Sequence, residues 1–201
     1  VNFSMSVGKL LLKWNINGYT LNAKGNVNRL SLYSAQIKNI NRISDLIKDL
    51  KHIEILYLQN NQLHDISALS GLEKLRKLYL SDNKLSDISA ITKFKTLTRL
   101  DIDNNILTDI SNLKELTNLE ILDLSNNQFS DISSLKGLTN LSELWLNNNK
   151  ITDLNSVKNT NVSLYPNPAK DKLYINTNNT EITKITISNI SGKILKININ
   201  F

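Results

Sequence analysis

A repeat of 22 residues constrains this chain more than any other feature of its sequence. Pairs of aliphatic residues separated by one position recur at Leu56/Leu58, Leu78/Leu80, Leu100/Ile102, Leu122/Leu124 and Leu144/Leu146. Each pair is followed three residues later by an asparagine, which gives the column Asn61, Asn83, Asn105, Asn127 and Asn149. A fixed period of this length is typical of repeat architectures, in which each unit buries its apolar face only against its neighbours. The sequence therefore predicts a solenoid, with an imperfect first copy beginning at Leu30.

Each aliphatic pair predicts a short strand with two inward side chains, and the strands of successive repeats are expected to form a parallel sheet. We call the five asparagines the Asn ladder and expect it to be structural. An inward amide can both donate to and accept from backbone groups that are left unpaired where the chain leaves the strand. A second column is expected to cap the short helical turns that follow, and it consists of Asp65, Asp87, Asp109, Asp131 and Asp153.

The repeat unit LxxLxLxxNxLxDIxxLxxL resembles the internalin-type leucine-rich repeat over residues 30 to about 158. The resemblance implies an α/β solenoid, a right-handed superhelix of about six repeats with a parallel β-sheet on its concave face. We assign residues 30–160 to this domain. The first copy is longer than the others, and Ser44 is expected to cap a short helix within it.

The residues before the repeats, 1–29, predict an amino-terminal cap. Residues 19–21 and 27–30 flank a polar turn, a pattern typical of a β-hairpin. A solenoid needs such a cap because its first coil would otherwise expose the core to water, and Trp14 supplies apolar cover.

The carboxy-terminal residues, 161–201, differ in composition and contain both prolines of the chain. Their alternating segments predict a small antiparallel β module. Residues 162–173, together with residues 187–193, resemble part of the carboxy-terminal sorting domain of type IX secretion cargo. This resemblance implies export across the outer membrane of a Bacteroidetes-type bacterium. We therefore expect a protein that is secreted, or attached to the outer cell surface of a Gram-negative bacterium.

Composition argues against several classes of function. The chain has no Cys and two His, so a cystine framework and a thiol nucleophile are excluded, and we expect no catalytic residues, no metal and no cofactor. The net charge is +6, but residues 51–158 carry 12 basic and 14 acidic side chains, which argues against a nucleic-acid partner. No apolar run approaches the roughly 18 residues of a membrane helix, so we expect no transmembrane segment.

The concave face, formed by the outward side chains of the strands, is where we expect function. It carries aromatic residues that the core does not require, and exposed Tyr and Trp dominate binding hot spots. Charged residues beside them could set specificity. The candidate partner-binding residues are Tyr33, Tyr57, Tyr79, Trp145, Lys77, Arg99, Asp101 and Asp123. An open sheet is expected to offer its carboxylates no pocket that would shift their pKa.

The leading hypothesis is a monomeric binding module, not an enzyme, that holds a protein partner of unknown identity on this face. One alternative is carbohydrate binding by the same aromatic residues, and another is substrate recognition within a larger secreted enzyme. Catalysis by this chain is disfavoured because His64 has only Asp65 beside it, and no nucleophile and base converge on the concave face.

Overall fold

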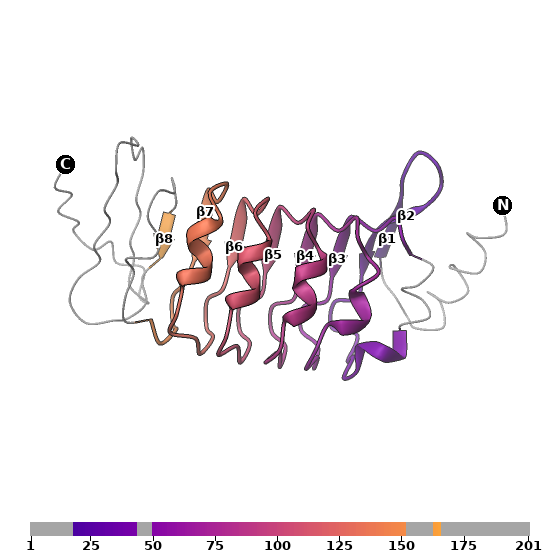
Figure 1. The fold of residues 1–201 in the computed structure, drawn as a ribbon. Helices are drawn as coiled ribbons and strands as arrows, with labels where there is room; N and C mark the ends of the chain where they lie inside the picture. The colour runs from indigo at the N-terminus through magenta and orange to yellow at the C-terminus, as the bar shows by residue number, and fades with distance from the viewer. Residues whose placement is uncertain (1–17, 44–49, 152–162, 166–201) are drawn as a thin grey trace.

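The fold is a solenoid built on one sheet, seen here in a computed structural model that describes residues 18–43, 50–151 and 163–165 (Figure 1). The described residues form eight strands, which lie side by side in chain order from β1 to β8. β1 pairs with β2 in antiparallel fashion, and every later pair of neighbours is parallel. The strands are β1 (Gly18–Leu21), β2 (Val27–Ser31), β3 (Ile55–Tyr57), β4 (Lys77–Tyr79), β5 (Arg99–Asp101), β6 (Ile121–Asp123), β7 (Glu143–Trp145) and β8 (Ser163–Tyr165).

The strands are in register with the sequence repeat. The central leucine of β3, Leu56, pairs in turn with Leu78 of β4, and Leu78 pairs with Leu100 of β5. These leucines are at most 1% exposed, whereas both flanking residues of each strand point outward. Because side chains alternate along a strand, a slip of one residue would turn every leucine to solvent. The predicted solenoid and its parallel sheet are confirmed.

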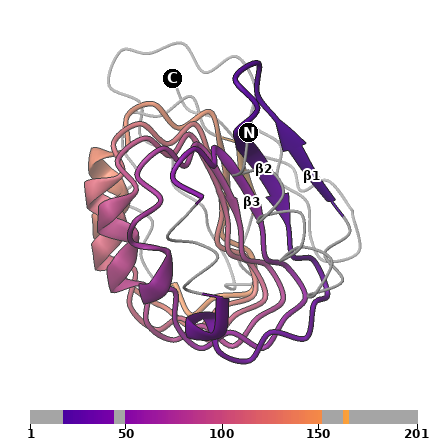
Figure 2. The same cartoon turned by 90° about the vertical axis from the view of Figure 1, so that its right-hand side faces the viewer.

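The return path of each described repeat contains a 3₁₀ helix, and the last four of these helices stack in a column opposite the sheet (Figure 2). Each of the last four carries one buried aliphatic residue that packs into the core. The 3₁₀ helices are η1 (Ile40–Ile43), η2 (Ser67–Leu69), η3 (Ser89–Lys93), η4 (Ser111–Glu115) and η5 (Ser133–Gly137). No helix in the described part of the chain has the length and apolar character that crossing a membrane demands.

The amino-terminal hairpin is confirmed by the pairing of β1 with β2. Its loop turns at Gly25, whose φ of 76° lies in the left-handed region that favours glycine. Asn22 stabilises the loop, because its Oδ1 accepts the backbone N–H groups of Lys24 and Asn26, both at 3.0 Å. The other expected parts of the cap, including Trp14, lie outside the described residues, and so does the helix expected at Ser44.

At the carboxy end the sheet continues past the expected domain boundary at 160/161. β8 lies in the segment that the sequence assigns to the sorting-type module, yet it pairs in parallel with β7, as the repeat strands pair with one another. Tyr165 takes the register position beside Trp145. The predicted antiparallel strands of the module fall on residues 166–201, outside the described part.

Candidate functional site on the concave face

The Asn ladder is structural, as predicted. The Oδ1 of Asn105 accepts the backbone N–H of Leu85, in the preceding repeat, at 2.9 Å. Its Nδ2 donates to the carbonyl oxygens of Leu80, Ile102 and Asp103, each at 3.1 Å. The same pattern recurs at Asn61, Asn83 and Asn127. Each of these amides therefore links two successive repeats through buried backbone groups that would otherwise be unpaired.

A column that sequence reasoning missed lies directly before the ladder. The residues Asn60, Asp82, Asn104, Asn126 and Asn148 all have φ between 53° and 56°. Asn and Asp tolerate this left-handed conformation better than other residues with a Cβ atom. The invariable choice of Asn or Asp at this position was the available sequence signal, and it marks the tight turn that sends the chain away from each strand.

The Asp column serves the turns that lead into the 3₁₀ helices. Asp87 Oδ1 accepts the backbone N–H of Ser89 at 2.7 Å, and the Ser89 hydroxyl donates to Oδ2 at 3.2 Å. Asp109 and Asp131 bond to the serine two residues later in the same way, and Asp65 accepts both bonds from Ser67 on Oδ1. At the four described positions each Asp thus satisfies the free N–H of the first helical residue, as predicted, but it lies one residue before the N-cap, and the N-cap side chain itself makes no hydrogen bond.

The main feature of the concave face is a stacked column of four side chains. The rings of Tyr57 and Tyr79 lie 4.6 Å apart between centroids and are parallel within 3°. The guanidinium of Arg29 lies over Tyr57, 4.8 Å from the ring centroid, and that of Arg99 lies over Tyr79 at 5.4 Å. We call this Arg29–Tyr57–Tyr79–Arg99 arrangement the aromatic column. It spans the four strands β2 to β5.

Arg99 also forms a bidentate ion pair with the neighbouring carboxylate on its own strand. Its Nη2 lies 2.9 Å from Asp101 Oδ2, and its Nε lies 3.0 Å from Oδ1. The two residues are two apart in β5 and therefore point to the same side of the sheet. The side chain of Asp101 is only 15% exposed. Charge-assisted bidentate pairs are among the stronger hydrogen-bonded contacts, so this pair holds Arg99 in place.

The expectation that an open sheet leaves its carboxylates unperturbed is wrong. Burial raises the pKa of Asp101 above its ordinary value, and the hydrogen bond from Arg99 opposes this effect only in part. Burial also raises the pKa of Asp123, although Ser125 donates its backbone N–H to this carboxylate at 2.9 Å. Neighbouring side chains exclude water from these carboxylates even without an enclosed pocket, and the negative charge of Asp103 raises both pKa values further by repulsion.

The remaining predicted site residues are spread along the same face. Lys77 lies on β4 and is exposed, and Trp145 lies on β7 and is half-buried. Tyr33, 60% exposed, follows β2 and makes no ring contact with another described residue. The structure thus brings Tyr57, Tyr79 and Arg99 together. It adds Arg29, which sequence reasoning left out because no spacing rule singles out an arginine that covers a tyrosine of the next repeat.

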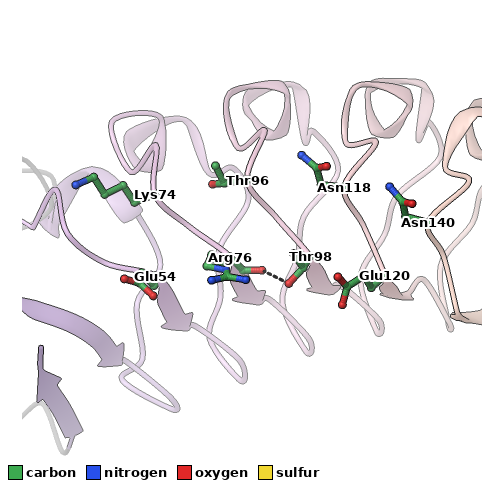
Figure 3. Close-up of a pocket in the computed structure, with 8 residues that line it drawn as sticks. All are labelled: Glu54, Lys74, Arg76, Thr96, Thr98, Asn118, Glu120 and Asn140. Carbon is green, nitrogen blue, oxygen red and sulfur yellow. Dashed lines mark hydrogen bonds between the residues drawn. The ribbon is translucent and has the colours of Figure 1, made fainter.

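A hollow lies on the flank of the solenoid, next to the amino ends of the strands (Figure 3). Its volume is about 740 Å³, and it is lined by Glu54, Lys74, Arg76, Thr96, Thr98, Asn118, Glu120 and Asn140. Several lining donors bond to the preceding repeat. Asn118 Nδ2 donates to the Lys95 carbonyl at 2.8 Å, and Asn140 Nδ2 donates to the Thr117 carbonyl at 2.9 Å. These side chains therefore join neighbouring repeats.

The two histidines lie apart from the concave face, and the described residues contain no cluster that could hold a metal ion. His52 lies 3.4 Å from the Lys74 ammonium through its Nδ1, and His64 is exposed in a turn. Within residues 18–43, 50–151 and 163–165, no three His, Asp or Glu side chains converge in a way that could hold a metal ion. The ionisable and aromatic groups that the concave face presents include guanidinium, carboxylate and phenol groups.

Comparison with known proteins gives three family matches. Residues 25–85 match the family described as Leucine rich repeat, and residues 73–115 and 117–159 match two copies of Leucine Rich repeats. Residues 163–201 match the Secretion system C-terminal sorting domain. No curated protein is similar enough to this chain to count as a relative.

Among solved structures, an internalin (inlF) from Listeria monocytogenes is 27% identical, with a TM-score of 0.67 over 82% of this chain. The chain spans about half of that protein, 48% of its length. An internalin C2 (inlC2) from the same species is 25% identical over 69% of this chain and 80% of that one, with a TM-score of 0.50. The chain is thus a leucine-rich repeat protein of the internalin-like type that carries a sorting-domain sequence at residues 163–201.

Proposed function

We propose that this chain is a secreted or cell-surface binding module, without catalytic activity of its own, that holds a protein partner on its concave face. Leucine-rich repeats and a secretion sorting sequence support an exported interaction module. The observation that carries the proposal further is the aromatic column, which lies on the outward side of the sheet and contributes nothing to the aliphatic core.

The composition and rigidity of the aromatic column suit a protein interface. Tyr and Arg are enriched among the residues that dominate binding energy, and they cluster in well-packed patches. Stacking orders these side chains before any partner arrives, so little side-chain entropy remains to be lost on binding. Burial raises the pKa of Tyr79 above its ordinary value of 10.0, and a side-chain hydrogen bond with Tyr57 acts in the same direction, so the two phenols are linked by their hydroxyl groups as well as by their rings.

The carbohydrate alternative loses part of its support in this arrangement. A sugar ring packs on an open aromatic face, but each face of Tyr57 and Tyr79 is covered by the other ring or by a guanidinium. Only the ring edges and the two hydroxyl groups remain for a ligand. These groups suit the mixed polar and apolar surface of a protein better than a stacked sugar.

A second alternative is that the chain recognises the substrate of a larger secreted enzyme, whose catalytic part would lie outside these 201 residues. This alternative uses the same concave face, and it differs only in what the captured partner is used for. The concave-face test below therefore applies to both.

The test uses a dodecapeptide library displayed on phage and selected against the folded chain. The strongest peptide is then measured by fluorescence anisotropy against Tyr57→Ala and Tyr79→Ala. We expect each substitution to weaken binding at least about fivefold, which corresponds to about 1 kcal/mol. The matched controls are Lys93→Ala and Lys114→Ala, on the opposite side of the solenoid, and both are expected to bind as the parent does. Normal binding by the tyrosine variants, together with loss of binding by the lysine variants, would refute binding on the concave face.

Export is tested separately. We propose that residues 163–201 direct the chain through a type IX system to the outer surface of a Gram-negative bacterium or into the medium. A reporter fused to these residues should become accessible to external protease in a host that has this system. A reporter that stays protected, while a complete sorting domain delivers it, would contradict the proposal.

A further inference from the structure

The two arginines at the ends of the aromatic column differ in one respect. Arg99 covers Tyr79 and also binds the carboxylate of Asp101, two residues later on the same strand. Arg29 covers Tyr57 in the same way, but the residue two positions later is Ser31. Among the described residues, the column therefore has a carboxylate partner for its arginine at β5 and none at β2.

The guanidinium of Arg29 is available for an ion pair. Its side chain is exposed, and it forms no salt bridge with any residue in the described part of the chain. Contact with the Tyr57 ring covers one flat face of the guanidinium and leaves the N–H groups along its edge free to donate. A guanidinium held in this way matches the two oxygens of a carboxylate.

We propose that Arg29 is the subsite for a carboxylate supplied by the protein partner, from an Asp or Glu side chain. In this complex the partner completes at β2 the Arg–carboxylate pair that Asp101 completes within the chain at β5. Lys77, exposed on β4 and in the same outward row as Arg29, adds a second positive charge near the subsite. The inference rests on the proposed function and specifies the chemistry of its partner as an acidic peptide segment.

The charge of the rest of the face fixes where this acidic segment binds. Beyond the Arg99–Asp101 pair the charged outward residues of the described strands are acidic, with Asp103 after β5, Asp123 in β6 and Glu143 in β7. These carboxylates repel an acidic segment at the β5 to β7 end. The acidic group of the partner therefore lies at the β2 to β4 end, and any basic group of the partner lies at the other.

The test reproduces the Arg99–Asp101 pair at β2. Ser31→Asp places a carboxylate at the position that Asp101 occupies relative to Arg99, so that Arg29 is paired internally. The dodecapeptide library is selected in parallel against the parent chain and against Ser31→Asp. We expect Asp and Glu to be enriched at a fixed position in peptides recovered with the parent, and this enrichment to disappear with Ser31→Asp. A parent selection without acidic enrichment, or without any binder, overturns the inference.

Affinity measurements separate this inference from the proposed function. For the strongest acidic peptide, Arg29→Gln and Ser31→Asp should each raise Kd at least tenfold, whereas Lys136→Gln, which removes an exposed charge from η5, should change it less than twofold. Replacing the acidic residue of the peptide by its amide should greatly weaken binding to the parent. The same replacement should change binding to Arg29→Gln only slightly. If Tyr57→Ala abolishes binding while Arg29→Gln has no effect, the proposed binding on the concave face is retained and the carboxylate subsite is refuted.

Discussion

Replacing Asn105 by alanine tests the structural account most sharply, because the consequences can be followed atom by atom. The side chain is 6% exposed and bonds to four backbone groups. Three of these are carbonyl oxygens that keep another donor: Asn83 Nδ2 for Leu80, Asn127 Nδ2 for Ile102, and the Asp82 N–H for Asp103. The Leu85 N–H has no second partner in the described structure, so it is left buried and unpaired.

The expected loss of stability follows from these hydrogen bonds. One orphaned buried donor costs about 1–3 kcal/mol, and the weakened bonds to the carbonyl groups add about 1 kcal/mol more. We therefore expect Asn105→Ala to lower the free energy of unfolding by about 2–4 kcal/mol. At about 2–4 °C per kcal/mol for a chain of this size, Tm falls by roughly 4–16 °C.

The assay is urea denaturation followed by far-ultraviolet circular dichroism, with Asn118→Ala as the matched control. Asn118 undergoes the same chemical change but is exposed and donates one hydrogen bond, so its loss should stay within about 0.5–1 kcal/mol. Asn105→Asp should be worse than Asn105→Ala at pH 7, because it sets a carboxylate against three carbonyl oxygens. Equal midpoints for Asn105→Ala and Asn118→Ala would refute the role assigned to the Asn ladder.

Three further changes have defined outcomes. Asp123→Asn should raise the free energy of unfolding at pH 7 and leave it unchanged near pH 3. The pKa of Asp123 is raised in the folded state above the unfolded value of 3.8. The ionised carboxylate therefore lowers the free energy of unfolding as the pH rises through the folded pKa. Urea denaturation at several pH values would detect this loss. Leu100→Ala, at a fully buried position, should cost about 2–5 kcal/mol in the same urea assay. Asp87→Ala, at an exposed turn, should cost about 0.5–2 kcal/mol, and a loss as large as that of Leu100→Ala would contradict its assignment as a cap.

The sequence predicts the core and the Asn ladder well because both follow from the repeat period. Leu56, Leu78 and Leu100 occupy equivalent positions, and a period of 22 residues can place them in register only by stacking. The hydrogen bonds of Asn105 follow from the same equivalence, since each amide meets the same backbone groups in the preceding repeat.

The concave face was predictable as a set of outward positions but not as an arrangement of side chains. Nothing in the repeat determines that Arg29 covers Tyr57 or that Tyr57 stacks on Tyr79, because these contacts depend on rotamers at positions where the repeat pattern imposes no residue. The raised pKa of Asp101 and of Asp123 has the same origin, since the water excluded from each carboxylate depends on how its neighbours pack.

Hydroxyl-radical footprinting of the chain, alone and in complex with the strongest selected peptide, tests the central claim most directly. The method reports the solvent exposure of individual side chains, and the concave face offers the reactive residues Tyr33, Tyr57 and Tyr79. We expect oxidation of Tyr57 and Tyr79 to fall in the complex, while oxidation of Ile106, 44% exposed in a turn after β5, and of exposed His64 stays unchanged. Unchanged oxidation of both tyrosines, with protection of residues in η2 to η5 instead, would contradict a concave binding face.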